Sequence, residues 1–173
     1  RMLSKHGGKD KYNVEHIGYN ARLDTLQAAI LLAKLKYVDD FNVRRRHVAE
    51  VYTEGLRGLG AVVPPDAGVG MEHVYHQYTV RITGGKRDRM KDHLASAGIG
   101  SMVYYQVPLH EMATFDGRCK VAGNLGETAA AAGEVLSLPM EPLLTEEEMA
   151  YTVSRIRDFH ASGTVHAGMQ TAL

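Results

Sequence analysis

Asn20 and Arg22 stand one residue apart, directly ahead of a stretch whose apolar spacing predicts a helix. An amide can donate a hydrogen bond to a phosphate without adding charge, whereas a guanidinium offers a planar fork that suits a phosphate or a carboxylate. The pair is therefore suited to recognising an anion from a loop that the helix anchors. A plainer interpretation stays open, in which Asn20 is only the N-cap of the helix and Arg22 a surface charge.

A second set of polar groups surrounds Pro108, in a loop that follows a predicted strand: Tyr104, Tyr105 and His110. Phenols offer hydroxyl groups and rings on which a sugar can pack. From composition alone, an equally good explanation is that these tyrosines have no part in binding and are simply core or rim residues at the end of a strand.

Three segments of the chain, in this order, resemble the DegT/DnrJ/EryC1/StrS group of pyridoxal-phosphate-dependent sugar aminotransferases: Gly18 to Ile30, Val103 to His110, and Leu136 to Met140. The resemblance extends from Arg1 to about Phe159. It implies the C-terminal portion of a fold-type I enzyme that resembles aspartate aminotransferase. The expected fold class is α+β, from an α/β parent, with a small sheet packed with helices.

The resemblance also implies roles for individual residues. The position of Asn20 is the one that reaches the phosphate of pyridoxal 5'-phosphate in the neighbouring subunit of a homodimer, and Arg22 is expected to meet the nucleotide-sugar substrate. Tyr104, Tyr105 and His110 are expected to contact the same substrate. Gln106 departs from the family pattern, because many members carry a proline there.

The implied reaction moves an amino group, from glutamate, to a keto group of a nucleotide-linked sugar. The segment Leu23 to Gln27 is similar to members that act at the 3-position. None of the lysines lies in the sequence context of the family's Schiff-base lysine, which we expect upstream of Arg1 together with the aspartate that pairs with the pyridine nitrogen. The chain alone is therefore expected to hold no catalytic residue and to be inactive.

A different class of function explains the folded core and the missing lysine equally well, namely a non-catalytic α+β binding or dimerisation module. It does not explain why Asn20, Arg22 and the loop from Tyr104 to His110 fall in the order of the family.

Composition limits the partners. Lys plus Arg equals Asp plus Glu at 20 each, so no net field favours nucleic acid or an anionic membrane surface. No apolar run approaches the roughly 18 residues of a membrane span. A single cysteine, Cys119, and no signal sequence predict a cytoplasmic protein.

A chain that begins at Arg1 without an initiator methionine is expected to be a processed, truncated or incompletely represented product.

The pattern along the chain predicts alternating helices and short strands. We expect a loop over residues 1–22 that reaches a partner's active site, a small domain with its leading helices over 23–160, and a flexible tail over 161–173. Thr145 and Glu148 have the spacing of a capping box. The expected elements are helices from Leu23, over Phe41 to Leu59 (capped by Gly60), Lys86 to Ala97, Val121 to Glu134 and from Thr145, and strands over Glu72 to Thr83, Ile99 to Tyr104 and Val135 to Leu138.

Other chemistries find little support. His73 and His76 are the closest histidine pair, but residues three apart on a strand point to opposite faces, so no zinc site is expected. His76 is predicted to be a core residue, and His73 to lie on the other face. Ser137 lacks the glycine elbow of a catalytic serine, and Gly84-Gly85-Lys86 lacks the spacing of a phosphate-binding loop.

Overall fold

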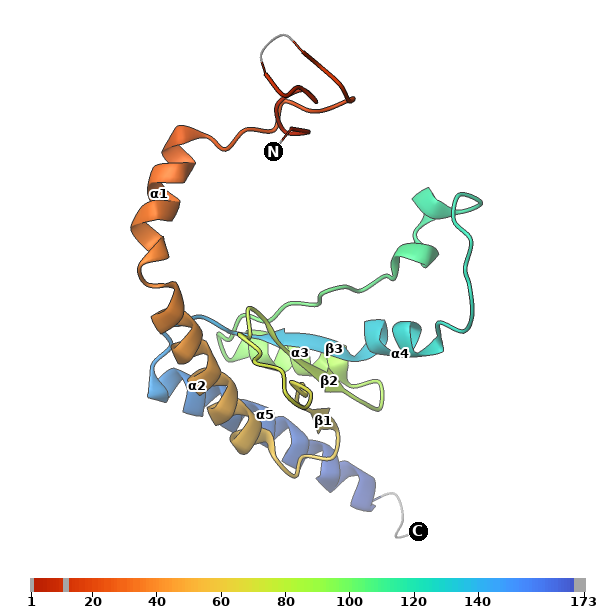
Figure 1. Ribbon diagram of the computed structural model, residues 1–173. Coiled ribbons are helices and arrows are strands. Elements are labelled where there is room, and N and C mark those ends of the chain that lie inside the picture. The colour runs from red at the N-terminus through yellow and green to blue at the C-terminus, as the bar shows by residue number, and fades with distance from the viewer. Residues whose placement is uncertain (1, 11–12, 170–173) are drawn as a thin grey trace. The chain divides into compact units, whose positions relative to one another are not determined.

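The computed structural model describes residues 2–10 and 13–169 (Figure 1). The chain divides into two units, Arg1–Asp40 and Phe41–Leu173.

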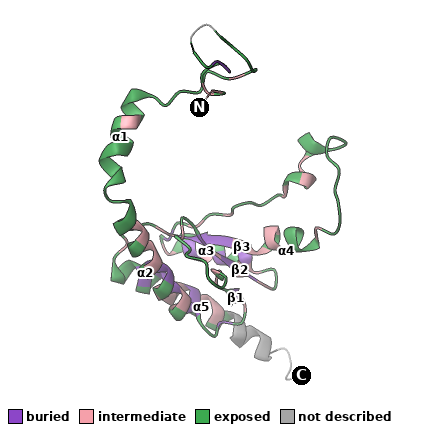
Figure 2. Ribbon diagram, viewed as in Figure 1, coloured by how far each residue is buried: buried purple, intermediate pink, exposed green. Residues whose placement is uncertain are grey.

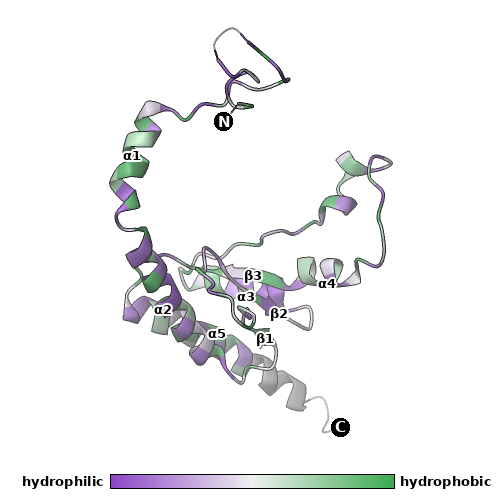
Figure 3. Ribbon diagram, in the orientation of Figure 1, coloured by the Kyte–Doolittle hydropathy of each residue, from purple (hydrophilic) through white to green (hydrophobic). Residues whose placement is uncertain are grey.

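The first unit consists of a loop and helix α1 (Thr25–Leu35). The helix begins where the Asp24 carboxylate accepts a hydrogen bond from the backbone N–H of Leu26 at 2.8 Å. No residue of α1 is buried, although Figure 3 shows that much of it is apolar and Figure 2 that it is exposed. The predicted helix is thus confirmed, while its apolar face is not covered within the part of the chain that the structure describes. The exposed apolar residues are Leu26, Ile30, Leu31, Leu32 and Leu35.

The second unit is an α+β domain around a three-stranded antiparallel sheet in the order β1-β2-β3. Its strands are β1 (Val62–Val63), β2 (Tyr78–Ile82) and β3 (Val135–Leu138). Its helices are α2 (Val38–Leu56, whose first residues belong to the first unit), α3 (Arg87–Ser96), α4 (Gly126–Glu134) and α5 (Glu146–Met169), with short 3₁₀ turns over Leu109–Glu111 and Ala113–Phe115.

Alternation along β2 builds the core of this domain. Tyr78, Val80 and Ile82 are buried, whereas Thr79 and Arg81 on the other face are half-buried. The buried side chains meet apolar residues from the helices and from β3 in one continuous cluster, which Figure 2 shows along the sheet, α2 and α5. The helical and β3 members include Tyr52, Leu56, Met90, Leu94, Leu136, Met149 and Ile156.

Two buried tyrosines make the polar contacts of this core. The Tyr52 hydroxyl donates to the carbonyl of Pro139 at 3.0 Å, and the Tyr78 hydroxyl lies 2.8 Å from Thr53 Oγ1. Burial raises the pKa of Tyr78 to about 12 and also raises the pKa of Tyr52. Both phenols therefore remain protonated across the neutral range, and Tyr52 keeps the proton that it donates to the Pro139 carbonyl.

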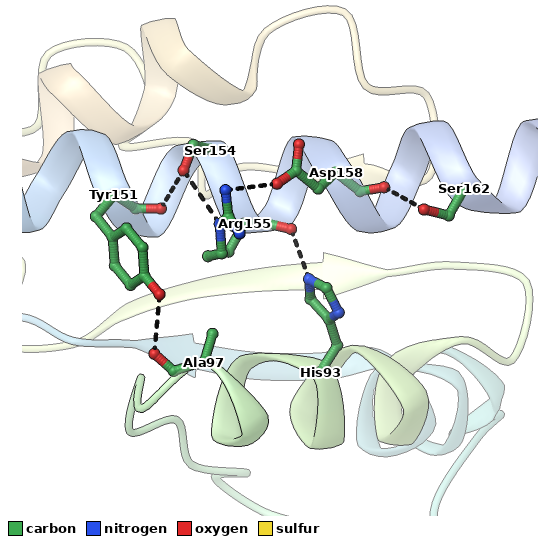
Figure 4. A network of polar contacts seen from close by, with 7 residues as sticks. All are labelled: His93, Ala97, Tyr151, Ser154, Arg155, Asp158 and Ser162. Atoms are coloured by element: carbon green, nitrogen blue, oxygen red, sulfur yellow. Dashed lines mark hydrogen bonds and ion pairs between the residues drawn. The ribbon is translucent and has the colours of Figure 1, made fainter.

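A polar network joins α3 to α5 (Figure 4). His93 Nε2 lies 2.9 Å from the carbonyl oxygen of Arg155, and the Tyr151 hydroxyl donates to the carbonyl of Ala97 at 3.2 Å. A carbonyl only accepts, so His93 must carry a proton on Nε2. These bonds tie the end of α3, where the last carbonyls of a helix need donors, to one face of α5.

Several predicted boundaries were wrong. The strand expected over Glu72 to Thr83 is confirmed only over Tyr78–Ile82, because Tyr75 has a left-handed backbone with φ of 47° that ends the extended segment. Residues 99–104 form a single bridge, between Met102 and Ser137, and no strand. The first helix of the second unit ends at Leu56, before Gly58 with φ of 81°, and the Gly60 cap was wrong. The two-residue strand β1 was not predicted.

The last helix continues to Met169, beyond the end of its apolar pattern. The predicted flexible tail over 161–173 overlaps this helix, and its residues 170–173 lie outside the described residues. The proposed division into 1–22, 23–160 and 161–173 stays a prediction. Among the described residues, no helix has the length and apolar character needed to cross a membrane.

Gly55 sets the distance between α2 and α5. A Cβ atom there would lie 2.7 Å from Val153 Cγ1, and the Gly55 carbonyl accepts a bond from Arg157 Nε at 2.7 Å.

A substitution at Gly55 tests this contact. Alanine is favoured over glycine in a helix by about 0.5–1 kcal/mol, but overpacking of a core costs about 1–3 kcal/mol. We therefore expect Gly55→Ala to lower the free energy of unfolding by about 1–2 kcal/mol, measured by urea unfolding followed by circular dichroism. Combined with Val153→Ala, it should cost much less, whereas strict additivity would contradict the contact. Gly133→Ala, with open space at its Cβ, is the matched control.

The capping box of α5 is confirmed. The Thr145 N–H and Oγ1 both donate to Glu148 Oε2, at 2.9 and 3.0 Å, and the Glu148 N–H donates to Thr145 Oγ1 at 3.2 Å. These bonds hold the pKa of Glu148 below its ordinary value.

Because a lowered pKa stabilises the folded protein only while the carboxylate is charged, the contribution is present at neutral pH and is lost as pH falls below about 4. We expect Glu148→Ala to destabilise the protein at pH 7, by a margin that shrinks toward pH 3 in thermal unfolding. Glu147→Ala removes the same charge from the same helical turn and is the control. A margin that is constant with pH would contradict the assignment.

Candidate functional site

Asn20 and Arg22 lie together on the first unit. Arg22 Nε donates to Asn20 Oδ1 at 3.2 Å, so the amide NH₂ of Asn20 and the terminal nitrogens of Arg22 remain as donors. Both side chains are exposed and line a depression of about 500 Å³. The interpretation of Asn20 as the N-cap was wrong, because the cap is Asp24. The pair is thus available for a ligand with several acceptor oxygens.

Antiparallel backbone pairing positions this pair. Asn20 bridges Lys5, and the N–H of His6 donates to Tyr19 O at 3.0 Å while the N–H of Ala21 donates to Ser4 O at 3.1 Å. These bonds fix Asn20 in register with a segment fifteen residues earlier in the chain. A segment with almost no buried side chains therefore has a defined backbone.

Glycine is required where the two segments touch. A Cβ atom on Gly18 would lie 2.1 Å from the backbone nitrogen of Gly7, and one on Gly7 would lie 1.7 Å from the carbonyl oxygen of His16. Real Cβ atoms do not approach backbone atoms so closely, so any larger residue must push the segments apart. The glycine that opens the Gly-x-Asn-x-Arg sequence thus has a structural reason within this chain.

Tyr104 and Tyr105 line a groove of about 710 Å³ in the second unit. Their ring centroids are 5.7 Å apart in an edge-on arrangement, and Tyr105 is 74 % exposed. The groove continues over apolar residues of the following loop and of α4, namely Val107, Pro108, Leu109, Met112, Ala131 and Ala132. The two tyrosines are therefore rim residues, and the explanation as core residues was wrong.

Arg81 also lines this groove, and sequence reasoning gave it no role. Its guanidinium donates from Nε to Glu134 Oε2 at 2.8 Å, with a second nitrogen 2.7 Å from the same oxygen, and lies 3.7 Å from Glu127. The alternation of β2 was the available signal, because it places Arg81 on the face opposite Val80 and Ile82. Arg81 is the one cation among the residues that line the groove.

His110 lies apart from the groove. It lines a separate pocket with Phe115, Cys119 and Lys120, and its Nε2 is 3.5 Å from Glu111 Oε1. The structure thus brings Tyr104 and Tyr105 together but does not add His110 to them. Its role in substrate binding stays a prediction.

His76 is exposed, so its prediction as a core histidine was wrong. It lines a third pocket, of about 430 Å³, with Gln77, Ser101 and Tyr104. His73 Nδ1 accepts a bond from the N–H of Tyr75 at 2.8 Å. Within residues 2–10 and 13–169, no group of three or more His, Cys, Asp or Glu side chains could hold a metal ion.

The model of one protein family, the DegT/DnrJ/EryC1/StrS aminotransferases, matches residues 1–157 of this chain. The chain belongs to the DegT/DnrJ/EryC1/StrS aminotransferase family. The motif around Asn20 and the loop around Tyr104 both fall within the matched residues.

Relatives of the family cover nearly all of this chain. It is 43 % identical over 162 residues to a pleiotropic regulatory protein from Geobacillus stearothermophilus, a match over 92 % of this chain and 43 % of that protein. It is 35 % identical to dTDP-3-amino-3,4,6-trideoxy-α-D-glucose transaminase from Streptomyces venezuelae, over 92 % of this chain and 41 % of the relative. The chain thus spans less than half the length of these relatives.

Solved members of the family share the fold. The crystal structure of S. venezuelae DesV in complex with a ketimine intermediate is 34 % identical, with a TM-score of 0.85 over 92 % of this chain and 43 % of that one. DegT-family aminotransferases depend on pyridoxal 5'-phosphate, and NtdA from Bacillus subtilis, 25 % identical with a TM-score of 0.80 over 92 % of this chain and 38 % of that one, was solved with its cofactor PMP bound. The donors of Asn20 and Arg22 fit a phosphate-bearing cofactor or substrate.

The contact between Gly7 and Gly18 can be tested without any ligand. We expect Gly18→Ala to separate the paired segments, so the amide protons of His6, Tyr19 and Ala21 should exchange at least about tenfold faster in hydrogen-exchange measurements. Amides of β2 and β3 should be unaffected. Gly133→Ala is again the control, and unchanged exchange in Gly18→Ala would contradict the close approach.

Proposed function

We propose that this chain forms the C-terminal part, including the small domain, of a cytoplasmic fold-type I aminotransferase. The complete enzyme would transfer an amino group from glutamate to a keto group, at the 3-position, of a nucleotide-linked sugar. The observation that carries this proposal is the pairing of Asn20 with Arg22 on a glycine-closed loop, within a chain of this family. The S. venezuelae relative is named as a transaminase of a dTDP-linked 3-amino sugar, which supports both the nucleotide-linked substrate and the 3-position.

In this proposal Asn20 binds the cofactor phosphate of the neighbouring subunit in a homodimer. The hydrogen bond from Arg22 Nε to Asn20 Oδ1 occupies the acceptor of the amide and turns its NH₂ group outward as a donor. A neutral donor holds a phosphate without adding another charge. The bond therefore acts as an orienting contact, because the flipped amide would present an acceptor to an anion.

Arg22 keeps its terminal nitrogens for the substrate. A planar fork fits two oxygens of a phosphate or a carboxylate at once, and a lysine at position 22 would not supply that fork.

The groove around Tyr104 and Tyr105 is proposed to hold the sugar. An exposed aromatic ring offers a flat apolar surface to the C–H face of a sugar, and a phenol offers a donor at its edge. Arg81, paired with Glu134 and lying near Glu127, would form a polar wall of this groove. We propose that His110 contacts the same substrate from the neighbouring pocket that it lines.

When bound, pyridoxal 5'-phosphate supplies the aldehyde that accepts and returns the amino group. We propose that the lysine which holds the aldehyde belongs to a part of the complete protein outside these residues, since relatives extend over more than twice this length. The contribution of this chain is then binding and orientation, and the 173-residue chain by itself is expected to be inactive.

The proposal is tested by Asn20→Ala in the complete protein. A hydrogen bond to a charged group contributes about 1.5–3 kcal/mol, so we expect pyridoxal 5'-phosphate to bind about 10- to 100-fold more weakly, measured by titration of the absorbance of the apoenzyme. Asn13→Ala, in the same unit, is the matched control, because its amide donates to Asp10 instead. An unchanged cofactor affinity in Asn20→Ala would reject the phosphate role and would favour the non-catalytic binding or dimerisation module.

A further inference from the structure

Lys5 lies directly opposite Asn20 in the antiparallel bridge of the first unit. The flanking backbone bonds, from His6 to Tyr19 and from Ala21 to Ser4, define this as a non-hydrogen-bonded pair. In such a pair the two side chains project from the same face of the ladder. They also lie closer together than the side chains of a hydrogen-bonded pair. Lys5 therefore shares a face with Asn20, although fifteen residues separate them in the chain.

The same face includes Arg22. Its guanidinium reaches back to Asn20 at 3.2 Å, and Arg22 and Lys5 line one pocket of about 540 Å³ together with His6, Gly8, Lys9 and Asp10. Two cationic side chains, from segments joined by backbone pairing, thus face a common space.

The charges around this pocket are unequally balanced. Lys9 is paired with Glu15 at 2.8 Å, and the Asp10 carboxylate accepts from the backbone and side chain of Asn13 at 2.8 and 2.7 Å. Neither Lys5 nor Arg22 has an acidic partner among the residues that the structure describes. Lys5 and Arg22 therefore outweigh the remaining carboxylate of the lining, Asp10, and give the pocket a net positive charge.

We propose that Lys5 is a substrate-binding residue that acts with Arg22 on the diphosphate of the nucleotide-linked substrate. This assignment rests on the proposed function for the identity of the substrate. A diphosphate carries its charge on two adjacent groups, which two cations can share. The lysine ammonium is a compact point charge on a flexible stem, and the arginine fork fixes the geometry. Asn20, which is neutral, is left for the single phosphate of the cofactor.

The test measures binding of inorganic pyrophosphate, UDP and dTDP to the complete holoenzyme by isothermal titration calorimetry, without amino transfer. We expect Lys5→Met to weaken all three by about tenfold, because one charge-assisted contact is lost, and to reduce the dependence of affinity on salt. Lys5→Arg should retain most of the affinity. Lys34→Met, which removes a lysine from the last turn of α1, is the matched control.

The outcomes separate the two proposals. If Lys5→Met weakens pyrophosphate binding and leaves the affinity for pyridoxal 5'-phosphate unchanged, the assignment is supported, even where the holoenzyme shows no transfer to a sugar. If it weakens only the cofactor, Lys5 serves the cofactor phosphate and the diphosphate assignment is overturned. Pyrophosphate affinity that is equal in Lys5→Met and wild type, or absent from wild type, also overturns it.

Discussion

The buried face of β2 is the feature on which the second unit depends. β2 pairs with β1 along one edge and β3 along the other, so it is the strand that joins the sheet. Its side chains Tyr78, Val80 and Ile82 are almost inaccessible to solvent and meet residues from α2, α3 and α5. The opposite face of the same strand carries Arg81 into the groove beside Tyr104 and Tyr105. Successive side chains of β2 point to opposite faces of the sheet, so one face builds the core and the other lines the groove.

The end of α4 shows how this core reaches the groove wall. Arg87, which is 5 % exposed, donates to the carbonyls of Ala132 and Val135 at 3.2 and 3.4 Å, and Arg81 binds Glu134 from the other side. Two arginines therefore hold the junction between α4 and β3, where the last carbonyls of a helix need donors. Since α4 forms one wall of the groove, these contacts fix that wall to β3.

Sequence reasoning recovered what a local pattern determines. Val135–Leu138 is a strand as expected, and the capping box of Thr145 and Glu148 has the bonds that its spacing implies. The sequence-based prediction failed where the structure of a segment depends on a single backbone angle or on a residue far away in the chain. The φ of Tyr75 shortens β2 and exposes His76, and residues 99–104 had apolar strand character but gained only one bridge to β3. The alternation of β2 puts Arg81 on the face opposite the core, yet nothing local indicated that Glu134 would lie beside it, 53 residues later.

The two groups of candidate site residues depend on different forces. Tyr104 and Tyr105 depend on a core built from many side chains, so their surroundings cannot be read from one segment. Asn20 and Arg22 depend on backbone pairing and on two glycines, all within residues 4–22. A short motif therefore carries nearly all the information needed to place them, except the partner segment that contributes Lys5. Register, which sequence spacing does not show, brings that third side chain to the same face.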